Sequence, residues 1–291
     1  MKETLGIIGL GRMGMAAARK YIQAGYSVVG YARRKEVIDE FTALGGKAVR
    51  NCKEVALEAG KVIIYVLNDQ QVIEVIIGEN GILEGVHEGS GVICMATIDV
   101  ENLRMVAKRC AEQSVPFLDC PVTGGPQRIQ AGTLTIITAG KEDFVEACRA
   151  ILELQGRIVY VGKEPGLAQS VKHCNQLLVG TTQAVTMEVI TLARRQGLDP
   201  KLVCDVVGSG VAGSDYFRML AACILENKPS MGGLGQMCKD MGLVMNDSRR
   251  AKVPLVVGSA AYQYYLAALS LGMESAETSD LIHVVDRFSK A

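Results

Sequence analysis

The residues that most clearly indicate a chemical function form a glycine-rich turn near the start of the chain. Gly9-Leu10-Gly11-Arg12-Met13-Gly14 follows an apolar run, residues 5–8, and precedes an alanine-rich stretch, residues 15–24. In a strand-turn-helix unit, the first glycine permits a tight turn, the second leaves room for a pyrophosphate, and the third allows close packing. The helix that follows would direct free N–H groups at the phosphates. We predict a dinucleotide-binding loop, although a glycine motif of this kind alone also fits a plain connection.

The segment after the next apolar run indicates which dinucleotide would bind. An NAD enzyme places an acidic residue there to hold the ribose 2′-hydroxyl. This chain instead has Ala32-Arg33-Arg34. Guanidinium groups are bidentate donors for a phosphate, so NADP(H) is favoured over NAD(H). A basic helix start is the alternative, but cations at a helix N-terminus oppose its dipole.

The elements that must position these residues alternate between strands and helices over the first half of the chain. Beyond the glycine turn, the pattern predicts strands at 27–31, 62–67, 91–95, 116–119, 134–138 and 157–161, and helices at 35–44, 70–77 and 100–113. This alternation is typical of a doubly wound parallel sheet with helices on both faces.

Beyond Gly166 the pattern becomes helical throughout. Helices are predicted at residues 168–196, 201–207, 216–226, 235–250 and 255–271. Gly197 closes the first of them, and Pro200 prevents its continuation. The sequence thus predicts an α/β protein with an N-terminal Rossmann domain that binds NADP(H), residues 1–163, and a C-terminal all-helical domain for substrate binding and oligomerisation, residues 164–291.

Composition narrows the class of partner. The 291 residues are 49% hydrophobic, and 31 Lys and Arg balance 31 Asp and Glu, so no net charge attracts nucleic acid or an anionic membrane. Nine cysteines lack metal-ligand spacing, and neither a secretory segment nor a membrane-spanning run is present. We therefore expect a cytoplasmic protein with reduced thiols, no metal site and a small-molecule partner.

Four separated segments together resemble one family. They are Gly9-Leu10-Gly11-Arg12-Met13-Gly14, Asp119-Cys120-Pro121-Val122-Thr123-Gly124-Gly125, Gly166-Leu167-Ala168-Gln169-Ser170-Val171-Lys172-His173-Cys174-Asn175 and Lys239-Asp240-Met241-Gly242. In this order, they resemble the motifs of the β-hydroxyacid dehydrogenases, which include 3-hydroxyisobutyrate dehydrogenase, tartronate semialdehyde reductase and the glyoxylate/succinic semialdehyde reductases. The resemblance covers nearly the whole chain.

The resemblance implies a role for each segment. Lys172 would exchange a proton with the substrate oxygen, and Asn175 would orient the lysine and the substrate. Thr123, Gly124 and Gly125 would grip the substrate's carboxylate with one hydroxyl and two N–H groups. Further cofactor contacts would come from Leu67, Thr97 and Lys239.

The chain departs from the family pattern at several positions. Cys94-Met95-Ala96-Thr97 stands where relatives have Asp-Met-Ser-Thr, and the second amide that usually follows Asn175 is Gln176 here. Met231-Gly232-Gly233 lacks a phenylalanine common in relatives. Glycine leaves space unfilled, so we expect compounds larger than three-carbon semialdehydes to be accepted.

The sequence thus predicts an NADP(H)-dependent oxidoreductase that interconverts a small 3-hydroxy or 2-hydroxy acid with its semialdehyde or keto acid. Two alternatives are an imine reductase of the same architecture, which usually lacks a lysine at position 172, and a non-catalytic cofactor-binding protein. The resemblance also implies a homodimer or homotetramer.

Overall fold

The computed structural model describes residues 2–230 and 232–289. The chain divides into two compact units, Met1–Lys172 and His173–Ala291. The first unit includes the beginning of the long helix that follows residue 163. The predicted domain limits, 1–163 and 164–291, stay predictions.

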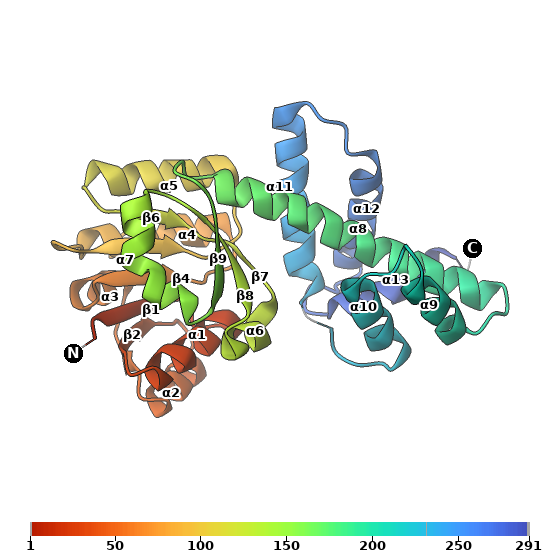
Figure 1. The fold of residues 1–291 in the computed structure, drawn as a ribbon, viewed down its shortest axis with the longest axis horizontal. Coiled ribbons are helices and arrows are strands. Elements are labelled where there is room, and N and C mark those ends of the chain that lie inside the picture. Colours follow the sequence, from red (N-terminus) through yellow and green to blue (C-terminus); the bar gives the residue numbers. More distant parts are fainter. Residues whose placement is uncertain (1, 231, 290–291) are drawn as a thin grey trace. The chain divides into compact units, whose positions relative to one another are not determined.

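The centre of the first unit consists of six parallel strands that belong to a nine-stranded sheet (Figure 1). Their order is β3 (Lys47–Ala48), β2 (Ser27–Tyr31), β1 (Thr4–Ile8), β4 (Lys61–Ile64), β5 (Gly91–Cys94) and β6 (Phe117–Asp119). This is the strand order of dinucleotide-binding doubly wound folds. The order reverses between β1 and β4, so ligands are expected at the carboxyl ends of the strands there.

Beyond β6 the sheet changes direction. β8 (Leu134–Ala139) runs antiparallel to β6 and to β7 (Val122–Thr123), and β9 (Gly156–Gly162) pairs parallel with β8. The link from β6 to β8 contains β7, which pairs antiparallel with β8, and the short helix α6 (Gly125–Ala131) between these two strands. The predicted doubly wound parallel sheet is confirmed for β1 to β6, whereas the antiparallel β8 at one edge departs from the prediction.

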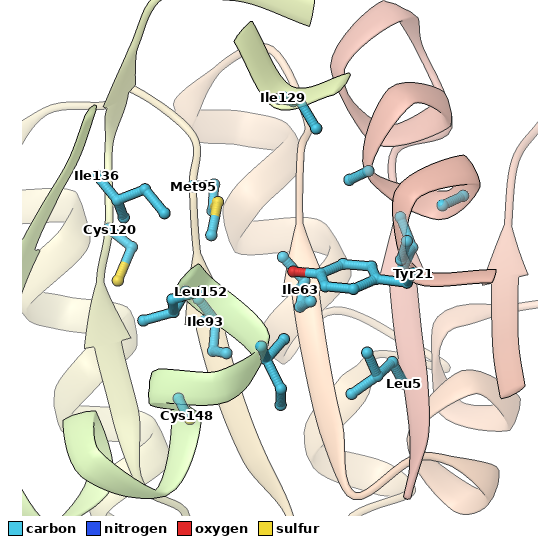
Figure 2. Packing of buried hydrophobic residues seen from close by; sticks show 14 of the residues in the cluster. Leu5, Tyr21, Ile63, Ile93, Met95, Cys120, Ile129, Ile136, Cys148 and Leu152 are labelled. Carbon is cyan, nitrogen blue, oxygen red and sulfur yellow. The ribbon is translucent and has the colours of Figure 1, made fainter. Parts of the chain in front are cut away.

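Alternating side chains place helices on both faces of the sheet. Leu5, Ile7, Ile63 and Ile93 belong to one cluster. Figure 2 shows Leu5, Ile63 and Ile93 of this cluster together with Tyr21 of α1. Their sequence neighbours face the opposite cluster, as the period of two in a strand requires. The first cluster includes side chains of α1 (Arg12–Gln23), α2 (Lys35–Ala43), α6 and α7 (Glu142–Glu153). The second includes side chains of α3 (Cys52–Glu58), α4 (Asp69–Ile77), the 3₁₀ turn η1 (Ile82–Glu84) and α5 (Val100–Glu112).

The second unit is helical, as predicted. Its core lies among α8 (Leu167–Arg195), which begins in the first unit, α9 (Pro200–Ser209), α10 (Asp215–Leu225), α11 (Leu234–Ala251), α12 (Val256–Ser270), η2 (Thr278–Asp280) and α13 (Leu281–Phe288). Tyr265 is fully buried there and hydrogen-bonds to the Gly180 carbonyl at 2.8 Å and to Gln183 Oε1 at 2.7 Å. Within residues 2–230 and 232–289, none of the helices combines the length and the apolar character needed to span a membrane.

Candidate active site

The glycine turn between β1 and α1 is built from positions that exclude a side chain. Gly9 has φ +91°, and a Cβ atom there would lie 2.7 Å from the backbone carbon of Tyr65, just after β4. A Cβ at Gly14 would lie 2.1 Å from the Gly9 carbonyl oxygen. Glycine at position 9 lets the turn lie close to the end of β4, and glycine at position 14 lets α1 lie close to the turn. The turn therefore lies where the strand order reverses.

Gly11 differs from both, because it faces open space. No atom that the structure describes, apart from its immediate chain neighbours, lies within 4 Å of a Cβ built there. Gly11 is also the N-cap of α1, and residues 12–15 include no acidic side chain. The positive end of the helix dipole thus meets an open backbone without an acidic side chain, which fits a pyrophosphate. Leu10 is buried and offers its backbone, whereas Arg12 is exposed and Met13 half-buried.

The segment that follows β2 lies at the same edge of the sheet. Ile8 pairs with Tyr31, so Ala32 leaves its strand beside the glycine turn. Arg33 is exposed, and Arg34 is the N-cap of α2. Two exposed arginine side chains directly after β2, the strand beside β1, fit a 2′-phosphate.

The loops after β4 and β5 reach this edge as well, since both strands run parallel to β1. Leu67 is exposed, and its N–H donates to Gln71 Oε1 at 2.9 Å. Thr97 is half-buried between two buried residues, Ala96 and Ile98. The structure therefore brings the glycine turn, Ala32, Leu67 and Thr97 to the carboxyl ends of neighbouring strands.

The residues predicted to bind a carboxylate form the turn from β7 into α6. Gly124 has φ +134° and Gly125 φ +77°, a region that favours glycine. Thr123 and both glycines are half-buried. The methylene chain of Arg128 covers Gly124, since a Cβ at Gly124 would lie 2.5 Å from Arg128 Cδ. The turn offers a hydroxyl and side-chain-free backbone, which suits an anion.

Lys172 lies near the beginning of α8 and is 6% exposed. Two buried residues to which the sequence assigned no role, Asp119 at the end of β6 and Gln169 on α8, hold this part of the helix. Burial raises the pKa of the Asp119 carboxyl to about 6, against the lowering effect of hydrogen bonds from Gly166 and Gln169. Both residues lie inside the matched motifs, yet nothing local in the sequence links positions that are 50 residues apart.

The other candidate residues belong to the second unit. Asn175 stands three residues after Lys172 on α8 and donates from Nδ2 to Gln176 Oε1 at 2.9 Å. Gln176 Nε2 donates to the buried Asp240 at 2.6 Å, and Lys239 Nζ lies 2.8 Å from the other Asp240 oxygen. The sequence marks Gln176 only as a departure from the family pattern. Its contact with Asp240 could not be predicted, because the two residues lie 64 positions apart.

The predicted aromatic-free pocket segment is only partly described. Met231 lies outside the described residues, and Gly232 has φ +133°, where a side chain would be strained. The expectation of larger substrates stays a prediction.

Two family models match the chain. One, described as the NAD binding domain of 6-phosphogluconate dehydrogenase, matches residues 4–162. The other, described as NAD-binding of NADP-dependent 3-hydroxyisobutyrate dehydrogenase, matches residues 166–285.

Individual proteins are similar over nearly the full length. The L-threonate dehydrogenase of Cupriavidus necator is 30% identical over 98% of this chain and 96% of its own. The mitochondrial 3-hydroxyisobutyrate dehydrogenase of Mus musculus is 33% identical over 96% of this chain and 86% of its own. The crystal structure of 3-hydroxyisobutyrate dehydrogenase from Salmonella typhimurium superposes with a TM-score of 0.88 at 26% identity, covering 97% of this chain and all of that one. With both halves of the fold, the glycine turn and the full-length relatives in agreement, the chain belongs to the β-hydroxyacid dehydrogenases, a family of nicotinamide-dependent oxidoreductases.

Proposed function

We propose that this oxidoreductase prefers NADP(H) and interconverts a small 3-hydroxy or 2-hydroxy acid with its semialdehyde or keto acid. The observation that carries the proposal is the burial of Lys172 on a fixed helix start, in the same unit as the glycine turn and Thr123. A buried, positioned amine is suited to general acid and base work, because burial limits competition from water for the proton that is transferred.

The cofactor contacts follow from the carboxyl edge of the sheet. The backbone of residues 9–14 would hold the pyrophosphate, and Arg33 with Arg34 the 2′-phosphate. Leu67 and Thr97 follow the next two strands and would flank the nicotinamide half. Lys239 enters this assignment through family resemblance alone. When bound, the cofactor donates hydride to the carbonyl carbon or accepts it from the alcohol carbon.

The protein's own residues would manage the acid group and the proton. Thr123, Gly124 and Gly125 bind the carboxylate and so fix the orientation of the carbonyl. Lys172 gives its proton to the substrate oxygen during reduction and receives it during oxidation. Asn175 keeps the lysine and the substrate oxygen in register. The two named relatives act on hydroxy acids of four carbons, so acids of that size are the first substrates to examine.

The test is a panel of acids with both cofactors. 3-Hydroxyisobutyrate, L-threonate and glycerate are offered with NADP⁺ and NAD⁺, and glyoxylate, succinic semialdehyde and a cyclic imine with NADPH and NADH. We expect turnover of at least one acid, with a higher kcat/KM for the phosphorylated cofactor. Turnover of a cyclic imine but of no acid would instead establish an imine reductase. Tight cofactor binding without any turnover would establish a non-catalytic protein.

We also propose a cytoplasmic homodimer or homotetramer. Leu178, Val185 and Leu192 are exposed and follow each other at seven-residue intervals along α8. Such a stripe on one side of a long helix is typical of a surface that packs against another helix. Light scattering after size-exclusion chromatography measures the mass directly, and a monomer at micromolar concentration would contradict the proposal.

A further inference from the structure

A buried carboxylate caps the helix that carries Lys172. Asp119 is fully buried at the end of β6. Its Oδ2 accepts hydrogen bonds from the N–H groups of Gly166 at 2.8 Å and Gln169 at 3.2 Å, and its Oδ1 accepts one from Gln169 Nε2 at 2.9 Å. The two N–H groups are orphan donors at the start of α8, and the residue that satisfies them comes from a strand 47 positions earlier. The cap is therefore tertiary, unlike those of α3 and α4, where the preceding asparagine accepts from the first turn.

Gln169 extends the same contact to a second strand. Besides bonding to Asp119, its Nε2 donates to the Ala96 carbonyl at 3.0 Å, and its Oε1 accepts from the Ile98 N–H at 3.1 Å. Ala96 and Ile98 flank Thr97 in the loop after β5. One fully buried amide thus fixes the loop after β5, the end of β6 and the start of α8.

Each of the three joined segments carries a residue of the proposed site. Thr97 lies between the two backbone groups that Gln169 holds, Thr123 follows Asp119 by four residues, and Lys172 follows Gln169 by three. A shift of the start of α8 would move the lysine relative to both loops. Displacements near 1 Å are enough to cost about a hundredfold in rate.

We propose that Asp119 and Gln169 are positioning residues for proton transfer, which hold the Lys172 end of α8 against the loops that carry Thr97 and Thr123. This inference rests on the proposed role of Lys172. Burying an ionised carboxylate in this position costs desolvation free energy, and a neutral side chain would cost less. What the carboxylate supplies is charge-assisted hydrogen bonding to the positive end of α8, which fixes the helix start more firmly than a neutral cap.

The test compares two glutamines on the same helix. Gln169→Met keeps the size of the side chain and removes its hydrogen bonds. Gln183→Met is the matched control, because Gln183 is also buried on α8 and its amide bonds to Tyr216 and Tyr265. Asp119→Asn is the second variant, with nearly the same shape and one acceptor replaced by a donor. If Gln169→Met fails to fold, Asp119→Asn still tests the same contact.

We expect Gln169→Met and Asp119→Asn to lower single-turnover hydride transfer by about ten- to a hundredfold. The NADPH dissociation constant should not change, because neither residue belongs to the glycine turn. Hydrogen exchange at the amides of residues 166–172 should accelerate in both variants and not in Gln183→Met. If the two residues had a purely structural role, the melting temperature would instead fall in all three variants, and hydride transfer would stay close to the wild-type rate.

The possible failures can be told apart. A wild-type enzyme that turns over no acid would overturn the proposed function and this role with it. Wild-type turnover together with unchanged hydride transfer in Gln169→Met and Asp119→Asn would overturn the positioning role alone.

Discussion

The side chain of Gln176 connects Asn175 to α11. Its carbonyl oxygen accepts a 2.9 Å hydrogen bond from Asn175 Nδ2, and its amide nitrogen donates a 2.6 Å hydrogen bond to the buried carboxylate of Asp240. The hydrogen bond to Gln176 fixes the side-chain nitrogen of Asn175. Because the amide group is planar, the same hydrogen bond also sets the direction of its oxygen.

Gln176→Asn should slow the reaction modestly. The shorter side chain cannot reach both partners, so one hydrogen bond is lost and Asn175 gains freedom. We expect kcat to fall about two- to tenfold, the effect of one such bond, with cofactor affinity unchanged. Steady-state kinetics with the best acid measures the change. Gln196→Asn, at an exposed position after α8, should behave as wild type. A Gln176→Asn enzyme with full kcat would show that the link to Asp240 does not serve catalysis.

Removal of Lys172 should have the largest effect on rate. A positioned general acid contributes about 10²–10⁴ in rate, so Lys172→Ala should lower kcat by that factor. Lys172→Arg should not restore it, because guanidinium holds its proton too firmly. Asn175→Ala should cost less, since it orients and does not transfer the proton.

Single-turnover hydride transfer with bound NADPH across pH measures the Lys172 effect. Lys163→Ala removes an exposed lysine from the same region and is the control. If Lys172→Ala transfers hydride at the wild-type rate with the wild-type pH profile, the proton must come from elsewhere, and Lys239 is the next residue to change.

Arg33 should discriminate between the two cofactors. A charge-assisted hydrogen bond to the 2′-phosphate exists only with NADPH, so Arg33→Ala should weaken NADPH about ten- to a hundredfold and leave NADH unaffected. Fluorescence titration of both reduced cofactors gives the dissociation constants, with the exposed Arg50→Ala as control. Equal wild-type affinities for the two cofactors, or a loss shared by both, would contradict the preference for NADP(H).

Asp119 should leave a signature in the pH dependence of stability. Burial raises its pKa from 3.8 to about 6 in the folded protein, so the folded state binds this proton more tightly than the unfolded state. The stabilisation from protonation is complete below about pH 4 and is lost as the pH rises through about 6.

The unfolding free energy of wild type relative to Asp119→Asn should therefore be greater at pH 4.5 than at pH 7, by about 2 kcal/mol. Urea denaturation of both proteins at the two pH values gives this difference, because contributions from all other groups cancel. A difference that is independent of pH, or one that grows toward neutral pH, would mean that Asp119 titrates near its ordinary value.

Local sequence patterns were enough to predict the fold class and most of the first unit. Periodicity of two in the strands, periodicity near 3.6 in the helices and the glycine turn are local properties, and they indicated a doubly wound sheet followed by a helical part. Short elements were not predicted. α3, α6 and β7 have seven residues or fewer, too few for a clear period, and α7 and α13 were also missed although both have apolar faces.

The pairs of residues that hold the site together could not be predicted from local patterns. Asp119 and Gln169 lie 50 positions apart, and Gln176 and Asp240 lie 64 apart. Another such pair is His173 and Asp247, whose Nδ1 and Oδ2 atoms lie 2.6 Å apart. Local sequence shows which residues can be buried, form turns or ionise, because these properties depend on each residue and its neighbours. Which polar group satisfies which buried partner depends on how distant segments pack, because a buried donor or acceptor must be paired within the folded chain.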